Sequence, residues 1–176
     1  MAHKQRVIKS EPRKGEKISV KTPTTIHALL AFANGALVTL SASWDVFAHR
    51  HKNMELYGTE GAIFVPDPNF FGGEVIVAGT DTVEKALPPW DHPFGVNNHT
   101  SSQGDVANYR AAGLADMAQG IMGKRDIRCS IDRMAHVVDV MTSILKSGET
   151  GKFVTLKTTC TRPRALGIAE ARALLK

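Results

Sequence analysis

The chain has 176 residues, of which 43% are hydrophobic and 22% charged, and its formal net charge is +5 at pH 7. This is the composition of an ordinary globular domain and excludes global disorder, and the apolar runs are too short and interrupted for a membrane span. Met1 to Arg6 lacks the apolar stretch of a secretory signal. Cys129 and Cys160 alone indicate neither a disulfide framework nor a cysteine zinc site. We therefore expect a single domain over residues 1–176 in a reduced, cytoplasmic protein.

Positive charge is concentrated in the leading segment. Residues 1–21 contain seven lysines and arginines and two glutamates, which accounts for the whole net charge. One interpretation is an electrostatic arm for nucleic acid or an anionic membrane, and the other is a solvated segment that is partly ordered over residues 1–15. No aromatic residue lies among these charges, although stacking aromatic residues usually accompany single-strand binding. We favour the solvated segment and expect neither a nucleic-acid nor a membrane partner.

The first half of the chain has the patterns of β-strands. Asn34-Gly35 joins two apolar runs and predicts a hairpin with a type I′ turn. Gly58 to Gly61 is interpreted as a turn rather than as a nucleotide-binding loop, because it is short and joins two strands. The strands expected from alternation and apolar runs are 17–21, 26–32, 36–44, 53–57, 62–65, 74–78 and 82–87.

The second half predicts a loop followed by helices. Residues 88–104 contain no periodic segment and are expected to form a long loop that is functional or mobile. Apolar residues three or four positions apart predict helices over 107–121 and 131–145. Ser130 occupies the N-cap position of the second helix and Gly148 its C-terminal glycine position. A strand over 153–156 and a short helix over 169–175 complete the chain.

Strands first and helices later predict an α+β fold. The expected architecture is an open, largely antiparallel or mixed sheet with helices packed on one face.

A histidine-rich stretch at an expected strand end is the first candidate site. His49 and His51 flank Arg50, and residues two apart on a strand face the same side, so the two imidazoles could bind a polyol, an anion or a metal. Asp45, which lies just before them, is a candidate for the same substrate site. The alternative is an exposed polar strand end with Asp45 as a turn residue. Two histidines are too few for a transition-metal site, and we expect no metal.

The loop over 88–104 holds the second group of candidates, which are His92, Asn97 and His99. Such loops often close over ligands, although plain surface positions are the alternative. Asp116 lies beside the apolar stripe of the first helix and is expected to be solvated. His136 is expected to flank the core of the second helix.

Several segments, taken in order, resemble a known family. They are Phe32 to Ala36, Met54 to Gly61 with its Gly-x-x-Gly ending, Asn108-Tyr109-Arg110 at the start of a helix, Ser130 to Leu145, Ser147 to Lys152, and Thr161-Arg162-Pro163. Over residues 6–166 the chain resembles the C-terminal domain of the glucose–fructose oxidoreductase, inositol dehydrogenase and rhizopine-catabolism family (Gfo/Idh/MocA). The resemblance implies a fold like the C-terminal domains of dihydrodipicolinate reductase and glyceraldehyde-3-phosphate dehydrogenase.

The resemblance also implies an activity that this chain does not complete. Members are two-domain NAD(P)-dependent dehydrogenases of sugars, inositols and related polyols. Their Gly-rich loop and catalytic lysine lie in an N-terminal Rossmann domain, and their catalytic aspartate and histidine lie before the part that matches here. We therefore assign no catalytic and no cofactor-binding residue to this chain, and expect NAD or NADP only in a full-length enzyme. His49-Arg50-His51 matches the strand end that approaches substrate in inositol dehydrogenase-like members.

Two functions follow as expectations. The first is the substrate-binding and oligomerisation domain of an NAD(P)-dependent oxidoreductase, inactive without its Rossmann half and forming a homo-oligomer through the open face of its sheet. The alternative is a stand-alone, non-catalytic ligand-binding or scaffold module derived from such a domain.

Overall fold

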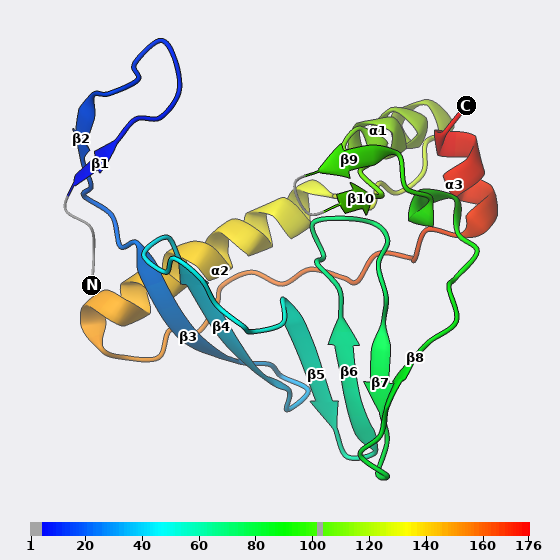
Figure 1. Cartoon of the computed structure of the whole chain (residues 1–176), viewed down its shortest axis with the longest axis horizontal. Helices are drawn as coiled ribbons and strands as arrows, with labels where there is room; N and C mark the ends of the chain where they lie inside the picture. Colours follow the sequence, from blue (N-terminus) through cyan, green and yellow to red (C-terminus); the bar gives the residue numbers. More distant parts are fainter. Residues whose placement is uncertain (1–4, 102–103) are drawn as a thin grey trace. The chain divides into compact units, whose positions relative to one another are not determined.

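The computed structural model describes residues 5–101 and 104–176 (Figure 1). The chain divides into two compact units, Met1–Arg50 and His51–Lys176, and each is described by itself. Every strand pair among the described residues is antiparallel. Helices and antiparallel sheets together make the fold α+β, as expected. The single domain over 1–176 stays a prediction.

The first unit consists of two hairpins. The strands β1 (Gln5–Val7) and β2 (Lys17–Ser19) form one, and β3 (Thr25–Ala31) and β4 (Leu37–Ser43) form the other. The leading segment is therefore ordered as a hairpin from Gln5 onward.

The turn between β3 and β4 differs from the expected type I′. Gly35 is its one residue with positive φ, at 89°. The Gly35 N–H donates to Phe32 O and the Phe32 N–H donates to Ala36 O, each at 2.9 Å. This is a three-residue connection, a type I turn that ends in a glycine bulge. The hairpin prediction is confirmed and the turn type is wrong.

The second unit contains a four-stranded sheet with the order β5-β6-β7-β8. Its strands are Met54–Gly58, Gly61–Val65, Ile76–Ala78 and Glu84–Ala86. Gly58 pairs with Gly61 across a two-residue turn, which confirms the turn predicted there. A β-carbon on Gly61 would lie 2.3 Å from Ala78 O, so only glycine fits where β6 meets β7.

The expected loop over 88–104 is not without structure. It contains a short 3-10 helix, η1 (Pro93–Gly95), and the strand β9 (His99–Ser101), which pairs with β10 (Gly104–Val106). Phe94 is 1% exposed. Its ring stacks on Tyr109 at 4.8 Å between centroids and meets the edge of Phe71 at 5.2 Å. Aromatic packing orders this segment, and such packing leaves no periodic pattern in the sequence.

Three helices follow: α1 (Ala112–Gly123), α2 (Ile131–Thr150) and α3 (Ile168–Leu174). Ser130 caps α2 as predicted, accepting from the Arg133 N–H at 3.3 Å. The helix ends at Thr150, and the glycine at its C-terminus is Gly151, whose φ is 65°, and not Gly148. The strand expected over 153–156 does not form. Residues 108–110 precede α1 rather than opening it.

The apolar stripes of the helices are not their buried faces. In α1, Leu114 and Ile121 are about 70% exposed, whereas Asp116 and Gly120 are buried. None of the twenty residues of α2 is buried, so its stripe of Ile131, Met134, Val138, Met141 and Leu145 is exposed. No helix within the described ranges is both long and apolar enough to cross a membrane.

Candidate functional site

A small polar hollow lies at the β9–β10 hairpin. It has a volume of about 220 Å³ and is lined by Asn97, Asn98, His99, Thr100 and Asp105. Amide, imidazole, hydroxyl and carboxylate groups together can both donate and accept hydrogen bonds. Two of the predicted loop residues, Asn97 and His99, are thus brought together, although their role in binding stays a prediction.

Hydrogen bonds from neighbouring segments fix the hollow. The Asn98 amide accepts from the Asn108 N–H at 2.7 Å and donates to Asn108 O at 3.2 Å. The Thr100 hydroxyl donates to Asp105 Oδ1 at 2.7 Å across the hairpin. The Tyr109 hydroxyl donates to Val96 O at 2.8 Å, which ties the start of the hollow to the aromatic cluster. These hydrogen bonds therefore fix the backbone that carries the lining side chains.

His92 is not part of this hollow. Its Nδ1 accepts from the Phe94 N–H at 3.2 Å and so caps η1. The ring proton then lies on Nε2, which donates to Leu166 O at 3.2 Å. The Trp90 ring lies 4.5 Å from the imidazole between centroids. These contacts join η1 to the segment before α3, and binding of a ligand by His92 stays a prediction.

The histidine-rich stretch is not on a strand. β4 ends at Ser43 and β5 begins at Met54, so the expectation that His49 and His51 share one strand face is wrong. The first unit ends at Arg50 and the second begins at His51. Substrate binding by His49, Arg50 and His51 stays a prediction.

Asp45 has a clear set of contacts in the first unit. Its Oδ2 accepts from the hydroxyls of Thr24 at 2.6 Å and Thr25 at 2.7 Å. Its Oδ1 lies 3.7 Å from Arg6 Nη2, and only 10% of the side chain is exposed. Asp45 thus connects the start of β3, the end of β4 and β1, which is more than the turn role considered from the sequence.

An open groove lies over the four-stranded sheet. Its volume is about 540 Å³, and β5, β6, β7 and their turns line it, including Leu56, Tyr57 and Ile63. The lining is mostly apolar, and it holds one ionisable side chain besides Tyr57, that of Glu60. The groove therefore offers little for recognition of a polar ligand.

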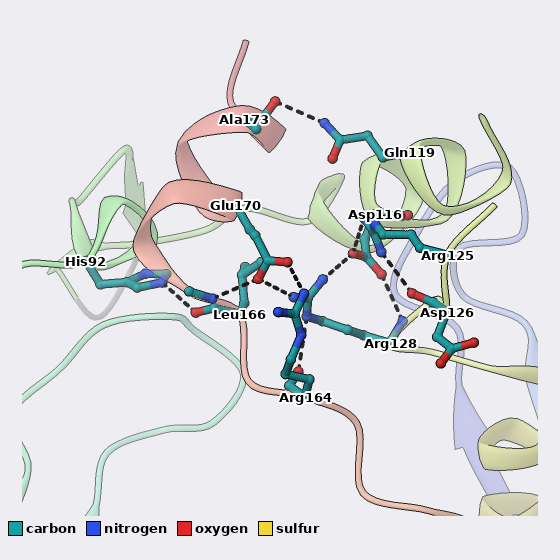
Figure 2. Close-up of polar contacts among 11 residues, drawn as sticks. His92, Asp116, Gln119, Arg125, Asp126, Arg128, Arg164, Leu166, Glu170 and Ala173 are labelled. Atoms are coloured by element: carbon teal, nitrogen blue, oxygen red, sulfur yellow. Dashed lines mark hydrogen bonds and ion pairs between the residues drawn. The ribbon is translucent and has the colours of Figure 1, made fainter. Parts of the chain in front are cut away.

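A cluster of charged side chains around the buried Asp116 joins α1 to α3 (Figure 2). Asp116 is 5% exposed. Its carboxylate accepts from Arg125 at 2.9 Å, from Arg128 at 2.5 Å and from the Arg128 N–H at 2.9 Å. Arg128 also donates to Glu170 at 2.8 Å, and Glu170 pairs with Arg164 as well. Asp116 is therefore buried and paired, and the expectation of a solvated residue is wrong.

The electrostatics of this cluster favour the ionised carboxylates. Burial alone would raise the pKa of Asp116, but the Arg128 N–H and the two guanidinium groups outweigh it and the pKa is lowered. The pKa of Glu170 is lowered chiefly by the Gly167 N–H. Every charged side chain in the cluster has a partner. The cluster therefore stabilises the contact between α1 and α3 and has no unpaired group to offer a substrate.

The described residues do not fit a nicotinamide dinucleotide or a metal ion. A Rossmann-type dinucleotide site has a glycine-rich loop between a strand of a parallel sheet and a helix, whereas the strand pairs in the described ranges are all antiparallel. No group of three or more His, Cys, Asp or Glu side chains in those ranges could hold a metal.

Comparisons with known proteins give a family match over part of the chain and a similar fold. Residues 2–64 match the model of the GFO/IDH/MocA C-terminal domain. Among solved structures, the chain is similar to one described as a putative oxidoreductase from Klebsiella pneumoniae, with a TM-score of 0.56 and 12% identity. That similarity covers 98% of this chain but 45% of the Klebsiella chain, so this chain spans less than half of that protein. A search of curated proteins gives no match.

Proposed function

We propose that this chain, which carries the GFO/IDH/MocA C-terminal domain over residues 2–64, is the substrate-binding and oligomerisation domain of an NAD(P)-dependent oxidoreductase. The proposed substrates are sugars, inositols or related polyols. The family match carries the proposal, and the fold shared with the Klebsiella protein over 98% of this chain supports it.

The proposal divides the work between two domains. Hydride transfer needs a cofactor that is held against the substrate. Because the described residues do not fit a dinucleotide, a separate nucleotide-binding domain would hold NAD or NADP, and this chain alone would be inactive. Cys129 and Cys160 are free and exposed, which supports a reducing, cytoplasmic compartment.

Recognition of a polyol needs donors and acceptors side by side, because each hydroxyl both donates and accepts. The hollow at β9–β10 supplies both kinds of group through Asn97, His99 and Asp105. His49, Arg50 and His51 are proposed as a second substrate-contacting segment, on the family resemblance. Both assignments stand as proposals for the full-length enzyme.

Oligomerisation is proposed through the sheet. Leu56, Tyr57 and Ile63 are 50%, 74% and 40% exposed on β5 and β6, and β5 is an edge strand of its sheet. Exposed apolar patches and open edges usually mark contacts with a partner. A second copy of the chain is the proposed partner.

Replacement of the two histidines tests the substrate site. In the full-length enzyme, H49A/H51A should raise KM or lower kcat by about tenfold or more, because lost hydrogen bonds to substrate hydroxyls leave polar groups unpaired. H27A is the matched control, since His27 is an exposed histidine of β3 whose Nδ1 contacts Ser41 Oγ at 3.0 Å. Steady-state kinetics that are the same in both variants would contradict the assignment.

A further inference from the structure

Arg110 is held in place by neutral groups. Its Nη2 donates to Asn69 Oδ1 at 3.0 Å, and its guanidinium carbon lies 6.0 Å from the centroid of the Phe70 ring. An arginine over an aromatic face gains a cation–π attraction without losing its charge.

The segment that carries Asn69 is itself fixed. The Asn69 N–H donates to Asp67 Oδ1 at 2.9 Å, and the Phe71 N–H donates to Ala107 O at 3.0 Å. Gly73 has a φ of 118°, and a β-carbon on it would lie 2.6 Å from Pro66 Cβ. The side chain of Arg110 therefore rests on a constrained loop.

Among the described residues of 51–176, no carboxylate lies within ion-pair distance of the Arg110 guanidinium. The arginines of the α1–α3 cluster show the contrast, because Arg125, Arg128 and Arg164 all pair with Asp116 or Glu170 (Figure 2). Arg110 makes no such ion pair there and is exposed. A guanidinium has five N–H donors, arranged to bind an anion through two bonds at once.

Polar groups that suit hydroxyls lie close to Arg110. The polar hollow is lined in part by Asn98, whose amide is bonded to the backbone of Asn108. Asn108 is two residues from Arg110, and two trans peptide units span at most about 7.6 Å. The Asn108 side-chain oxygen is buried and accepts no hydrogen bond among the described residues.

We propose that Arg110 binds an anionic group, a carboxylate or a phosphate, of a polyhydroxylated substrate whose hydroxyls occupy the adjoining hollow. This inference rests on the proposed function and narrows it from polyols in general to sugar acids or sugar phosphates.

Measurements of ligand binding to the full-length protein test the inference. Isothermal titration calorimetry with D-glucuronate, D-glucose 6-phosphate and D-glucose should show at least one of the two anions bound tenfold or more tightly than glucose. Tighter binding of glucuronate would identify the anionic group as a carboxylate, and tighter binding of glucose 6-phosphate would identify it as a phosphate. R110Q should remove the preference, and R110K, which keeps the charge but loses the fork of donors, should retain part of it.

R172Q is the matched control, because Arg172 is an exposed arginine of α3 outside this region, and it should bind all three compounds like the unchanged protein. Equal binding of glucose and both anions would overturn the role of Arg110 and leave the polyol function standing. An anion preference that survives in R110Q would overturn it too, and so would a protein that binds none of the three at millimolar concentration.

Discussion

A buried carboxylate such as Asp116 is tolerated only when its hydrogen-bonding capacity is used. Two guanidinium groups and one backbone N–H supply the partners, and they come from a segment nine to twelve residues further along the chain. Removing the charge of Asp116 takes an ion-pair partner from the partly buried Arg125 and Arg128, and loss of a partner costs more than the intact contact contributes.

D116N should therefore destabilise the protein by about 3 kcal/mol, at the lower end of the range for buried pairs because Arg125 is partly exposed. Urea unfolding at pH 7 measures the loss. D126N is the control, since Asp126 is exposed and its side chain makes no ion pair among the described residues. A free energy of unfolding within about 0.5 kcal/mol of wild type would show that the cluster contributes little.

The same residue sets a pH dependence. Because folding lowers the pKa of Asp116 below the unfolded value of about 3.9, its stabilisation is present above that pH. It is lost as the pH falls through the lower pKa of the folded state. Below about pH 4 the unfolding midpoint should fall less steeply in D116N than in wild type.

The end of α1 depends on the absence of a side chain at Gly120. Lys124, with a φ of 49°, turns the chain back, and Arg125 N–H donates to Gly120 O at 3.0 Å. A β-carbon at Gly120 would lie 2.2 Å from Ile127 Cγ2. The glycine thus permits the close crossing that brings Arg125 and Arg128 to Asp116.

Two glycine substitutions in the same helix should have opposite effects. G120A should lower stability by about 1–3 kcal/mol through overpacking. G113A, where a β-carbon meets no atom within 4 Å, should raise it by up to about 1 kcal/mol through helix propensity. Thermal unfolding of both variants gives the comparison, and a G120A protein as stable as G113A would contradict the close crossing.

Elements with local signals could be predicted from the sequence, and those set by tertiary contacts could not. Asn34-Gly35 and Ser130 determine the conformation of the backbone next to them. The hairpin and the start of α2 could therefore be predicted from the sequence. The ordering of 88–104 depends on Phe94 packing against Tyr109, and the burial of Asp116 depends on Arg128. Periodicity predicts that the apolar face of a helix is buried. In α1 the buried face instead contains Asp116, because its partners come from another part of the chain.

The candidate site shows the same division. The irregular composition of residues 88–104 singled out Asn97 and His99, and these two do line one hollow. The family resemblance pointed instead to His49, Arg50 and His51, whose role in binding stays a prediction. The hydrogen bond between Arg110 and Asn69 joins positions 41 residues apart, which a single sequence cannot reveal. His92 was a candidate for ligand binding by its residue type and its place in the loop. In the structure both of its ring nitrogens form hydrogen bonds with backbone groups.

At the scale of the whole molecule, the proposed function requires more chain than these 176 residues. An antibody against this chain should detect a native polypeptide of about twice 19.1 kDa in the source cell, because a nucleotide-binding domain adds about 100–200 residues. A band at 19 kDa would contradict the dehydrogenase and favour a binding or scaffold module.

The two tryptophans fall one in each unit. Trp44 lies at the end of β4, with the Arg6 guanidinium 5.7 Å from its ring centroid, and Trp90 lies against His92 in the second unit. The molecule therefore carries one fluorophore for each unit. Tryptophan emission from W90F reports on residues 1–50, and emission from W44F reports on residues 51–176. Comparing the unfolding curves of the two variants therefore distinguishes one cooperative unfolding event from two.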